Sequence, residues 1–176
     1  EHLLHTDLRR SDRLFYFTTC GWMMWNWLVS GLASGATLVL YDGSPAWPDD
    51  GALWRIAAEE GITVFGTSAK YLAASAKANV HPGRDFDLQR LRMVLSTGSP
   101  LAPESFDYVY QRVKADVHLA SISGGTDIIS CFLLGNPLLP VQRGELQCAG
   151  LGMAVVIYDE QGQSLTEGSG ELVCER

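Results

Sequence analysis

Short apolar runs alternate with longer amphipathic segments along most of the chain. The runs are rich in β-branched and aromatic residues, which is typical of buried parallel strands. The strands that they predict are Leu14–Phe17, Ala36–Tyr41, Ile62–Phe65, Leu91–Leu95 and Asp116–Ile122. The helices predicted between them are Trp22–Leu32, Asp49–Glu60 (with acidic residues in its first turn), Ser68–Ala78 and a segment from Pro103 to about Val113. A polar loop is expected over Asn79–Asp87.

This alternation predicts an α/β fold with a mostly parallel, doubly wound sheet flanked by helices. We assign residues 1–135 to this α/β unit. Beyond it the pattern changes to short β segments, Ala154–Tyr158 and Gly170–Cys174, with a hairpin turn at Asp159–Gly162. Residues 136–176 are therefore predicted to begin a β-rich subdomain.

An uncharged stretch tests this interpretation. No charged residue occurs between Arg13 and Asp42, and such a stretch is long enough to cross a bilayer. Threonine, serine, glycine and asparagine interrupt it, and its flanks lack the lysine and arginine asymmetry that orients membrane helices. A strand, a helix and a second strand explain the stretch better, so we predict no membrane span.

The composition favours a folded protein that handles small molecules. The 176 residues are 47% hydrophobic and 19% charged, which suits one compact core and argues against disorder. The 13 lysines and arginines against 20 acidic residues give a net charge of −7, so no nucleic acid partner is expected. The four cysteines form no C-x-x-C pair, which favours reduced thiols and a cytoplasmic location.

Ligands of α/β sheets bind beyond the carboxyl ends of strands, so the turns that follow strands are the candidates for a site. The first is the turn after Leu91–Leu95, where Gly98 allows a flat ligand to approach the backbone and Pro100 stiffens the loop. An ordinary strand-to-helix connection, with Ser99 and Pro100 at the helix start, is the alternative.

The second turn, Ser121–Asp127, is the densest polar cluster in the chain. Gly124 and Gly125 would each be costly in a regular element, by about 1 kcal/mol relative to alanine, and are used where the backbone turns sharply or touches a ligand. Thr126 and Asp127 add a hydroxyl and a carboxylate, and oxygen ligands are those that Mg²⁺ prefers. A β-turn with an aspartate helix cap is the alternative.

The third segment, Gly21–Trp27, combines three tryptophans and two methionines in a large, adaptable apolar surface. Its structural alternative is an apolar stripe that belongs to the core. The histidines are weaker candidates, because none has the spacing of a zinc site, and His2 and His5 are expected on a frayed terminal turn. Ser123 precedes two glycines as a hydrolase nucleophile does, but Ser121 occupies the first glycine position of G-x-S-x-G, so a serine hydrolase is a minor alternative.

Five ordered segments resemble motifs of the acyl-CoA synthetases of the adenylate-forming superfamily, over nearly the whole chain. These segments are Thr19–Pro45, Leu91–Glu104, Ser123–Asp127, Gly144–Gly152 and Gly168–Leu172. They are most similar to the members that activate acetoacetate. The resemblance implies an internal part of the large N-terminal domain of a ligase. In that reaction a carboxylate attacks ATP to give an acyl-adenylate and pyrophosphate, and the thiol of coenzyme A then displaces AMP.

The resemblance also implies roles for individual residues. The implied nucleotide-binding residues are Gly98, Ser99, Pro100, Ser121, Ile122, Ser123, Gly125 and Thr126. Thr126 and Asp127 stand at catalytic positions, with Thr126 on the phosphate and Asp127 where the family usually has a glutamate that binds Mg²⁺. Ser123 departs from the aromatic residue that many members place beside the nucleotide.

The acyl pocket implied by the resemblance consists of Trp22, Met23, Met24, Trp25 and Gly124. Gly124 matches a position that holds a tryptophan in acetate-activating relatives, so its missing side chain leaves room for extra carbons. A short keto acid such as acetoacetate is the expected substrate, and Gly124→Trp is expected to shift the preference toward acetate.

The family's phosphate-binding loop would lie upstream of Glu1. Its ribose-binding aspartate and its mobile C-terminal domain with the catalytic lysine would lie downstream of Arg176. We therefore expect this chain to be the central part of a longer ligase, inactive without the missing N- and C-terminal parts. A non-catalytic module that binds a nucleotide or a partner is the main alternative.

Overall fold

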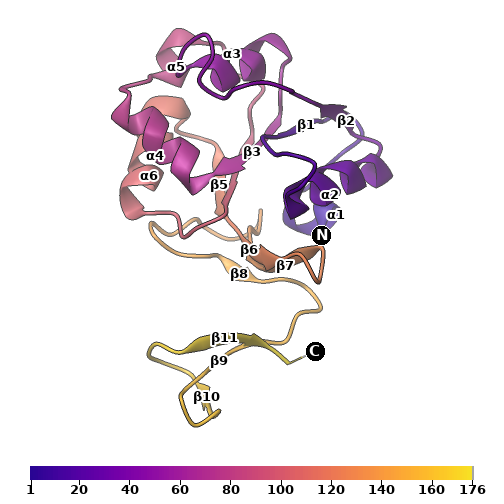
Figure 1. Cartoon of the computed structure of the whole chain (residues 1–176), viewed down its shortest axis with the longest axis vertical. Coiled ribbons are helices and arrows are strands. Elements are labelled where there is room, and N and C mark those ends of the chain that lie inside the picture. The colour runs from indigo at the N-terminus through magenta and orange to yellow at the C-terminus, as the bar shows by residue number, and fades with distance from the viewer. Residues whose placement is uncertain (176) are drawn as a thin grey trace.

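The computed structural model describes residues 1–175, and its centre is a five-stranded parallel sheet (Figure 1). The strands are β1 (Arg13–Tyr16), β2 (Thr37–Val39), β3 (Val64–Ser68), β4 (Met93–Thr97) and β5 (His118–Ser121). Their order in the sheet is β2-β1-β3-β4-β5, and each neighbouring pair is parallel. The predicted mostly parallel α/β sheet is confirmed.

Both faces of this sheet are covered, as parallel sheets require. The helices are α1 (His2–His5), α2 (Met23–Ser30), α3 (Ala52–Glu59), α4 (Ala69–Lys77), α5 (Pro82–Asp85) and α6 (Pro103–Tyr108), with the short helical segments η1 (Gly31–Ser34) and η2 (Val109–Val113) after α2 and α6. On one face α3, α4 and α6 bury a core that includes Trp54, Phe65 and Phe106. On the other face α2 packs through Met24 and Trp27.

Two helix predictions need correction. Helix α3 begins at Ala52 rather than Asp49, because the Asp49 carboxylate accepts a hydrogen bond from the Gly51 amide (2.9 Å) and pairs with Arg55. Its first turn therefore contains no acidic residue. Helix α5 lies inside the loop expected over Asn79–Asp87, where a proline opens it.

The segment after β5 is a hairpin rather than a single turn. Strands β6 (Ser123–Gly125) and β7 (Ser130–Leu134) are antiparallel, and β8 (Cys148–Ala149) pairs with β7. The two glycines that were expected to form the turn lie within β6, and the turn itself lies at residues 126–129. Cys131 and Leu134 of β7 pack on the same face of the central sheet as α2.

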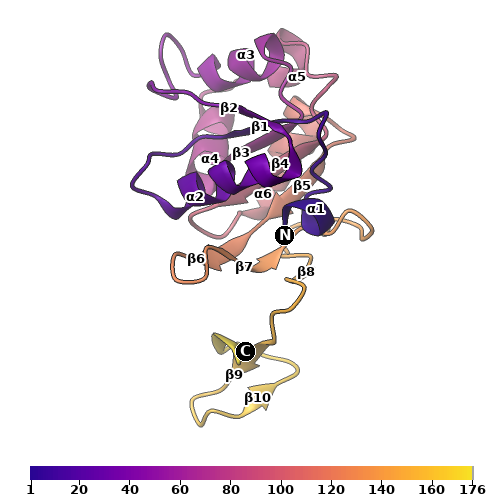
Figure 2. The same cartoon turned by 90° about the vertical axis from the view of Figure 1, so that its right-hand side faces the viewer.

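A separate three-stranded sheet follows, in the order β10-β9-β11, and stands apart from the α/β body (Figure 2). Its strands are β9 (Val155–Tyr158), β10 (Ser164–Leu165) and β11 (Glu171–Cys174). The hairpin expected around Asp159–Gly162 is present between β9 and β10. The domain boundary after residue 135 stays a prediction. Within residues 1–175, no helix is long and apolar enough to cross a membrane.

A partly buried ion pair joins the N-terminal segment to the central sheet. Asp12 is 5% exposed and accepts hydrogen bonds from Arg92 (Nη2–Oδ2 2.6 Å, Nε–Oδ1 3.0 Å) and from Thr63 Oγ1 (2.7 Å). Arg92 also donates to the carbonyl oxygens of Thr6 and Asp7. Burial opposes the ionisation of Asp12, yet the hydrogen bonds hold its pKa below the ordinary value of 3.8.

We expect Asp12 to make the free energy of unfolding depend on pH in the acid range. Its pKa is lower in the folded than in the unfolded chain, so its stabilisation is complete above the unfolded value and declines as the pH falls below about 5. Asp12→Asn does not ionise, so the stability difference between wild type and variant should shrink as the pH is lowered. Urea unfolding followed by circular dichroism across this range measures the difference, and a constant difference would contradict the prediction.

Candidate functional site

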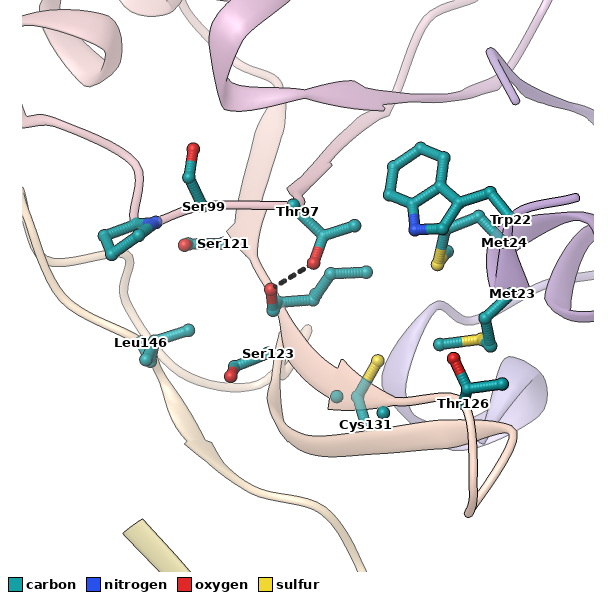
Figure 3. Close-up of a pocket in the computed structure, with 15 residues that line it drawn as sticks. Trp22, Met23, Met24, Thr97, Ser99, Ser121, Ser123, Thr126, Cys131 and Leu146 are labelled. Atoms are coloured by element: carbon teal, nitrogen blue, oxygen red, sulfur yellow. Dashed lines mark hydrogen bonds between the residues drawn. The ribbon is translucent and has the colours of Figure 1, made fainter. Parts of the chain in front are cut away.

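A cavity of about 370 Å³ lies at the carboxyl ends of β4 and β5, between α2 and the β6–β7 hairpin (Figure 3). It brings together twelve of the site residues expected from the sequence: Trp22, Met23, Met24, Gly98, Ser99, Pro100, Ser121, Ile122, Ser123, Gly124, Gly125 and Thr126. Trp25 and Asp127 are not among the lining residues. The motifs are thus close together in space, while the role of each residue stays a prediction.

The loop after β4 forms one side of the cavity. Gly98 has a φ of +87°, a left-handed conformation that favours glycine. A Cβ on Gly98 would lie 3.6 Å from the Trp22 ring, an ordinary contact, so the backbone conformation rather than space requires glycine. The neighbouring Thr97 donates its hydroxyl to the Ile122 carbonyl oxygen (2.7 Å), which holds the ends of β4 and β5 together (Figure 3).

Strands β6 and β7 form a second side, where two backbones nearly touch. The pairing register shifts at Ser123 and Gly124. A Cβ on Gly124 would lie 2.2 Å from the Ser130 carbonyl oxygen and 2.8 Å from Cys131 Cα. A side chain at Gly124 therefore fits only if the hairpin moves, and the expected shift of Gly124→Trp toward acetate stays a prediction.

Helix α2 supplies an apolar side through Met23 and Met24, which are both buried. Trp22 precedes this helix and packs edge-on against Tyr16, with the ring centroids 6.0 Å apart. Trp25 is half-buried and packs against the core beside α2 rather than lining the cavity. The tryptophan-rich segment therefore contributes both to the core and to the cavity.

Cys131 lines the cavity from β7. It is 2% exposed, and its Sγ points into the cavity (Figure 3). Burial raises the pKa of the Cys131 thiol, and burial also raises the pKa of the nearby Tyr16 well above its ordinary value. Both groups are neutral near pH 7, and no lining residue carries a charge, so this part of the cavity suits an uncharged group.

Thr126 lines the cavity, whereas the adjacent Asp127 is exposed in the turn between β6 and β7. Across residues 1–175, no group of three or more histidine, cysteine, aspartate or glutamate side chains is arranged to hold a metal ion. A hydrolase would need a histidine base beside Ser123. No histidine is among the residues that line the cavity with Ser123, so the structure gives the hydrolase alternative no support.

The expectation that His2 and His5 lie on a frayed turn is wrong. His5 is 6% exposed, its Nδ1 donates to the Gly135 carbonyl oxygen (2.8 Å), and its Nε2 accepts from the Leu151 amide (3.0 Å). His2 Nε2 lies 3.0 Å from the Trp27 carbonyl oxygen. The partners of His5 are 130 and 146 residues away along the chain, which no local pattern signals.

Three further lining residues had no role assigned from the sequence: Thr97, Cys131 and Leu146. Thr97 directly precedes Gly98 at the end of β4, so its place at the carboxyl edge could have indicated it. Cys131 reaches the cavity because β7 returns antiparallel to β6, and Leu146 because the loop before β8 folds back. Both depend on a hairpin that the apolar pattern does not reveal.

Comparison with known proteins identifies the family of this chain. The chain matches the family model of AMP-binding enzymes over residues 2–176. The acetoacetyl-coenzyme A synthetase of Rhizobium meliloti (strain 1021) is 61% identical over 176 residues, which are 100% of this chain and 27% of that protein. The acetoacetyl-CoA synthetase of Mus musculus is 52% identical over 174 residues, which are 99% of this chain and 26% of that protein.

A solved structure gives the same result. An acetoacetyl-CoA synthetase from Streptomyces lividans matches with a TM-score of 0.92 and 52% identity, over 98% of this chain and 27% of that chain. This chain thus spans about a quarter of the length of the relatives it matches. The resemblance to acyl-CoA synthetases inferred from five sequence motifs is confirmed. Because the family match extends over nearly every residue and includes the whole cavity, the chain belongs to the AMP-binding enzyme family.

Proposed function

We propose that this chain is the part of an ATP-dependent acid–thiol ligase that binds the nucleotide and the acyl group, with acetoacetate as the acid. The cavity carries this proposal, because it gathers at one sheet edge the residues that separate motifs assign to adenine, phosphate and acyl group. Its volume of about 370 Å³ lies within the range of small-molecule pockets. Relatives named acetoacetyl-CoA synthetases support the choice of acid.

The lining residues favour catalysis by positioning. The only titratable side chain among them is Cys131, whose buried thiol is neutral, so the cavity offers no general acid or base. Backbone groups of Gly98–Pro100 would face the edge of adenine, and the Thr126 hydroxyl would donate to a phosphate oxygen. Holding a carboxylate next to the α-phosphate converts a bimolecular attack into a step between fixed neighbours.

The apolar end would take the acyl group. Met23, Met24 and Cys131 leave a neutral, polarisable surface there. Beyond its reacting carboxylate, acetoacetate carries only a methylene, an uncharged carbonyl and a methyl group, so its far end matches this surface. A second carboxylate at that end would be buried without a counter-charge, which is unfavourable.

Mg²⁺ and coenzyme A complete the proposed reaction. Proteins commonly hold Mg²⁺ with one or two carboxylates together with substrate phosphates, and Asp127 beside Thr126 fits this mode. The ion would neutralise phosphate charge. Coenzyme A would take the acyl group from AMP through its thiol. Cys20, Cys131 and Cys148 form no disulfide, and reduced thiols are usual in the cytoplasm, which is the location that we propose.

We expect activity when this chain completes a full-length ligase, and none from the 176-residue chain alone. A chimera in which it replaces the matching region of the Streptomyces lividans protein should release pyrophosphate from ATP when acetoacetate is present, and should form the coenzyme A thioester. Its kcat/KM should be higher for acetoacetate than for acetate. The isolated chain should release no more pyrophosphate than a control without enzyme.

Paired aspartate variants in the chimera test the site. Asp127→Asn should lower kcat by about tenfold or more if its carboxylate supports phosphate charge neutralisation. Asp159→Asn, in the distant β9–β10 turn, is the matched control and should leave kcat unchanged. A folded chimera that shows no preference for acetoacetate would contradict the proposed substrate, and turnover by the isolated chain would contradict the need for the longer protein.

A further inference from the structure

The first residue of the chain joins two sides of the cavity, although it does not line it. The Glu1 carboxylate accepts hydrogen bonds from Trp27 Nε1 (2.5 Å), from the Ser130 hydroxyl and from the Cys131 amide (3.3 Å). Trp27 belongs to α2, whereas Ser130 and Cys131 belong to β7. Figure 1 shows the N-terminus beside both elements.

Trp27 depends on this acceptor. It is 2% exposed, and a buried indole N–H needs a hydrogen-bond partner. Trp27 follows Met23 by four residues and Met24 by three, so the three side chains lie on neighbouring positions of the same helix surface. The contact that fixes the indole therefore also restrains the methionines that line the cavity.

The Glu1 carboxylate also restrains β7, on the opposite side of the cavity from α2. It accepts from the backbone amide of Cys131, the residue whose Sγ points into the cavity. This contact lies where the β6–β7 register shifts, and a register shift disrupts the regular ladder of hydrogen bonds. An external acceptor at this position compensates for that irregularity.

His2 and His5 of helix α1 add further contacts to α2 and to the end of β7. The His2 ring lies 4.2 Å from the Trp27 ring, and His2 Nε2 lies 2.8 Å from the Ser30 hydroxyl oxygen. His5 Nδ1 is hydrogen-bonded to the carbonyl oxygen of Gly135, which directly follows β7. Helix α1 is thus tied to α2 on one side and to the end of β7 on the other.

We propose that Glu1 is a positioning residue that holds β7 against α2 and so sets the width of the acyl end of the cavity. The acyl assignment rests on the proposed function, but the contact itself does not. A carboxylate suits this place because its two oxygens can accept all three hydrogen bonds, and charged acceptors make the stronger bonds.

The Cys131 thiol reports on this contact without any ligand. In the wild-type chain it is buried, so iodoacetamide should modify it slowly, while the exposed Cys20 reacts quickly and serves as an internal reference. Glu1→Ala should raise the alkylation rate of Cys131, measured by peptide mass spectrometry, by about tenfold or more, since a charge-assisted hydrogen bond is lost and the carboxylate that helps to raise the pKa of the thiol is removed. Glu1→Gln keeps the shape and one acceptor oxygen, and should give a smaller increase.

Matched variants separate this effect from loss of fold. Glu59→Ala, at an exposed position of α3, should leave the alkylation rate of Cys131 unchanged. Trp27→Phe removes one donor, and combining it with Glu1→Gln should add little, because both changes break the same contact. General unfolding would raise the alkylation of Cys148 and Cys174 in parallel, whereas a local change raises that of Cys131 alone. Equal Cys131 rates in folded wild type and folded Glu1→Ala would overturn the proposal.

Kinetics in the chimera distinguish this proposal from the proposed function. Glu1→Ala should raise the KM for acetoacetate by about tenfold and leave the KM for ATP nearly unchanged, because only the acyl end loses its support. A chimera without ligase activity would contradict the proposed function while leaving the alkylation result intact. An active chimera in which neither the KM for acetoacetate nor the Cys131 alkylation responds to Glu1 would contradict the positioning role alone.

Discussion

Arg92→Leu is expected to lower the free energy of unfolding by about 1–3 kcal/mol or more, the cost of leaving buried acceptors, one of them charged, without a donor. The change leaves Asp12, 5% exposed, without a counter-charge. It also leaves the carbonyl oxygens of Thr6 and Asp7 without the donor that now binds them. Urea denaturation followed by circular dichroism measures the loss.

The ion pair between Arg143 and Asp107 is the matched control. It has the same two-bond geometry, with distances of 2.9 and 2.8 Å, but its side chains are 54% and 42% exposed. Arg143→Leu should therefore change the free energy of unfolding by less than about 1 kcal/mol. Adding Asp12→Asn to Arg92→Leu should recover part of the stability, because it removes the unpaired charge. Equal decreases in the free energy of unfolding for Arg92→Leu and Arg143→Leu would show that burial of Asp12 does not strengthen its ion pair.

The five strands of the central sheet could be identified from the sequence, because strands covered on both faces appear as continuous apolar runs. Their ends could not. Strand β4 was expected over Leu91–Leu95 and is observed over Met93–Thr97, and β3 likewise extends to Ser68. Polar residues continue both strands, since the hydrogen bonds of a parallel ladder join backbone groups whatever the side chain. Thr97, at the polar end of β4, also lines the cavity.

Most of the cavity could be predicted, because motifs that follow parallel strands must meet at the same sheet edge. The remaining parts could not, because they depend on contacts between distant segments. The Glu1 contact with Cys131 spans 130 residues. The glycines of β6 indicated a turn, since glycine is usually unfavourable in a strand. Only the close approach of Gly124 to Ser130 explains why glycine is needed in this strand.

Gly124→Ala is expected to destabilise the chain by about 1–3 kcal/mol and to weaken binding of AMP, whereas Gly125→Ala should change the free energy of unfolding little. The new Cβ on Gly124 would meet the Ser130 carbonyl oxygen at 2.2 Å and Cys131 Cα at 2.8 Å, and backbone atoms cannot rotate away as a flexible side chain can. A Cβ on the adjacent Gly125 would meet only a ring carbon of Phe132, at 3.8 Å, which is an ordinary contact.

Urea denaturation and calorimetric titration of AMP into the chimera test this pair of variants. If Gly124→Ala is destabilised and its AMP affinity falls, the main role of this glycine is to allow the close approach of β6 and β7. Any effect on acyl selectivity then follows from displacement of the hairpin. If the two alanine variants are equally stable, the hairpin moves at little cost in free energy. In that case a larger side chain at Gly124 would reach the cavity and shorten the acyl pocket directly, as the sequence resemblance to acyl-CoA synthetases implies.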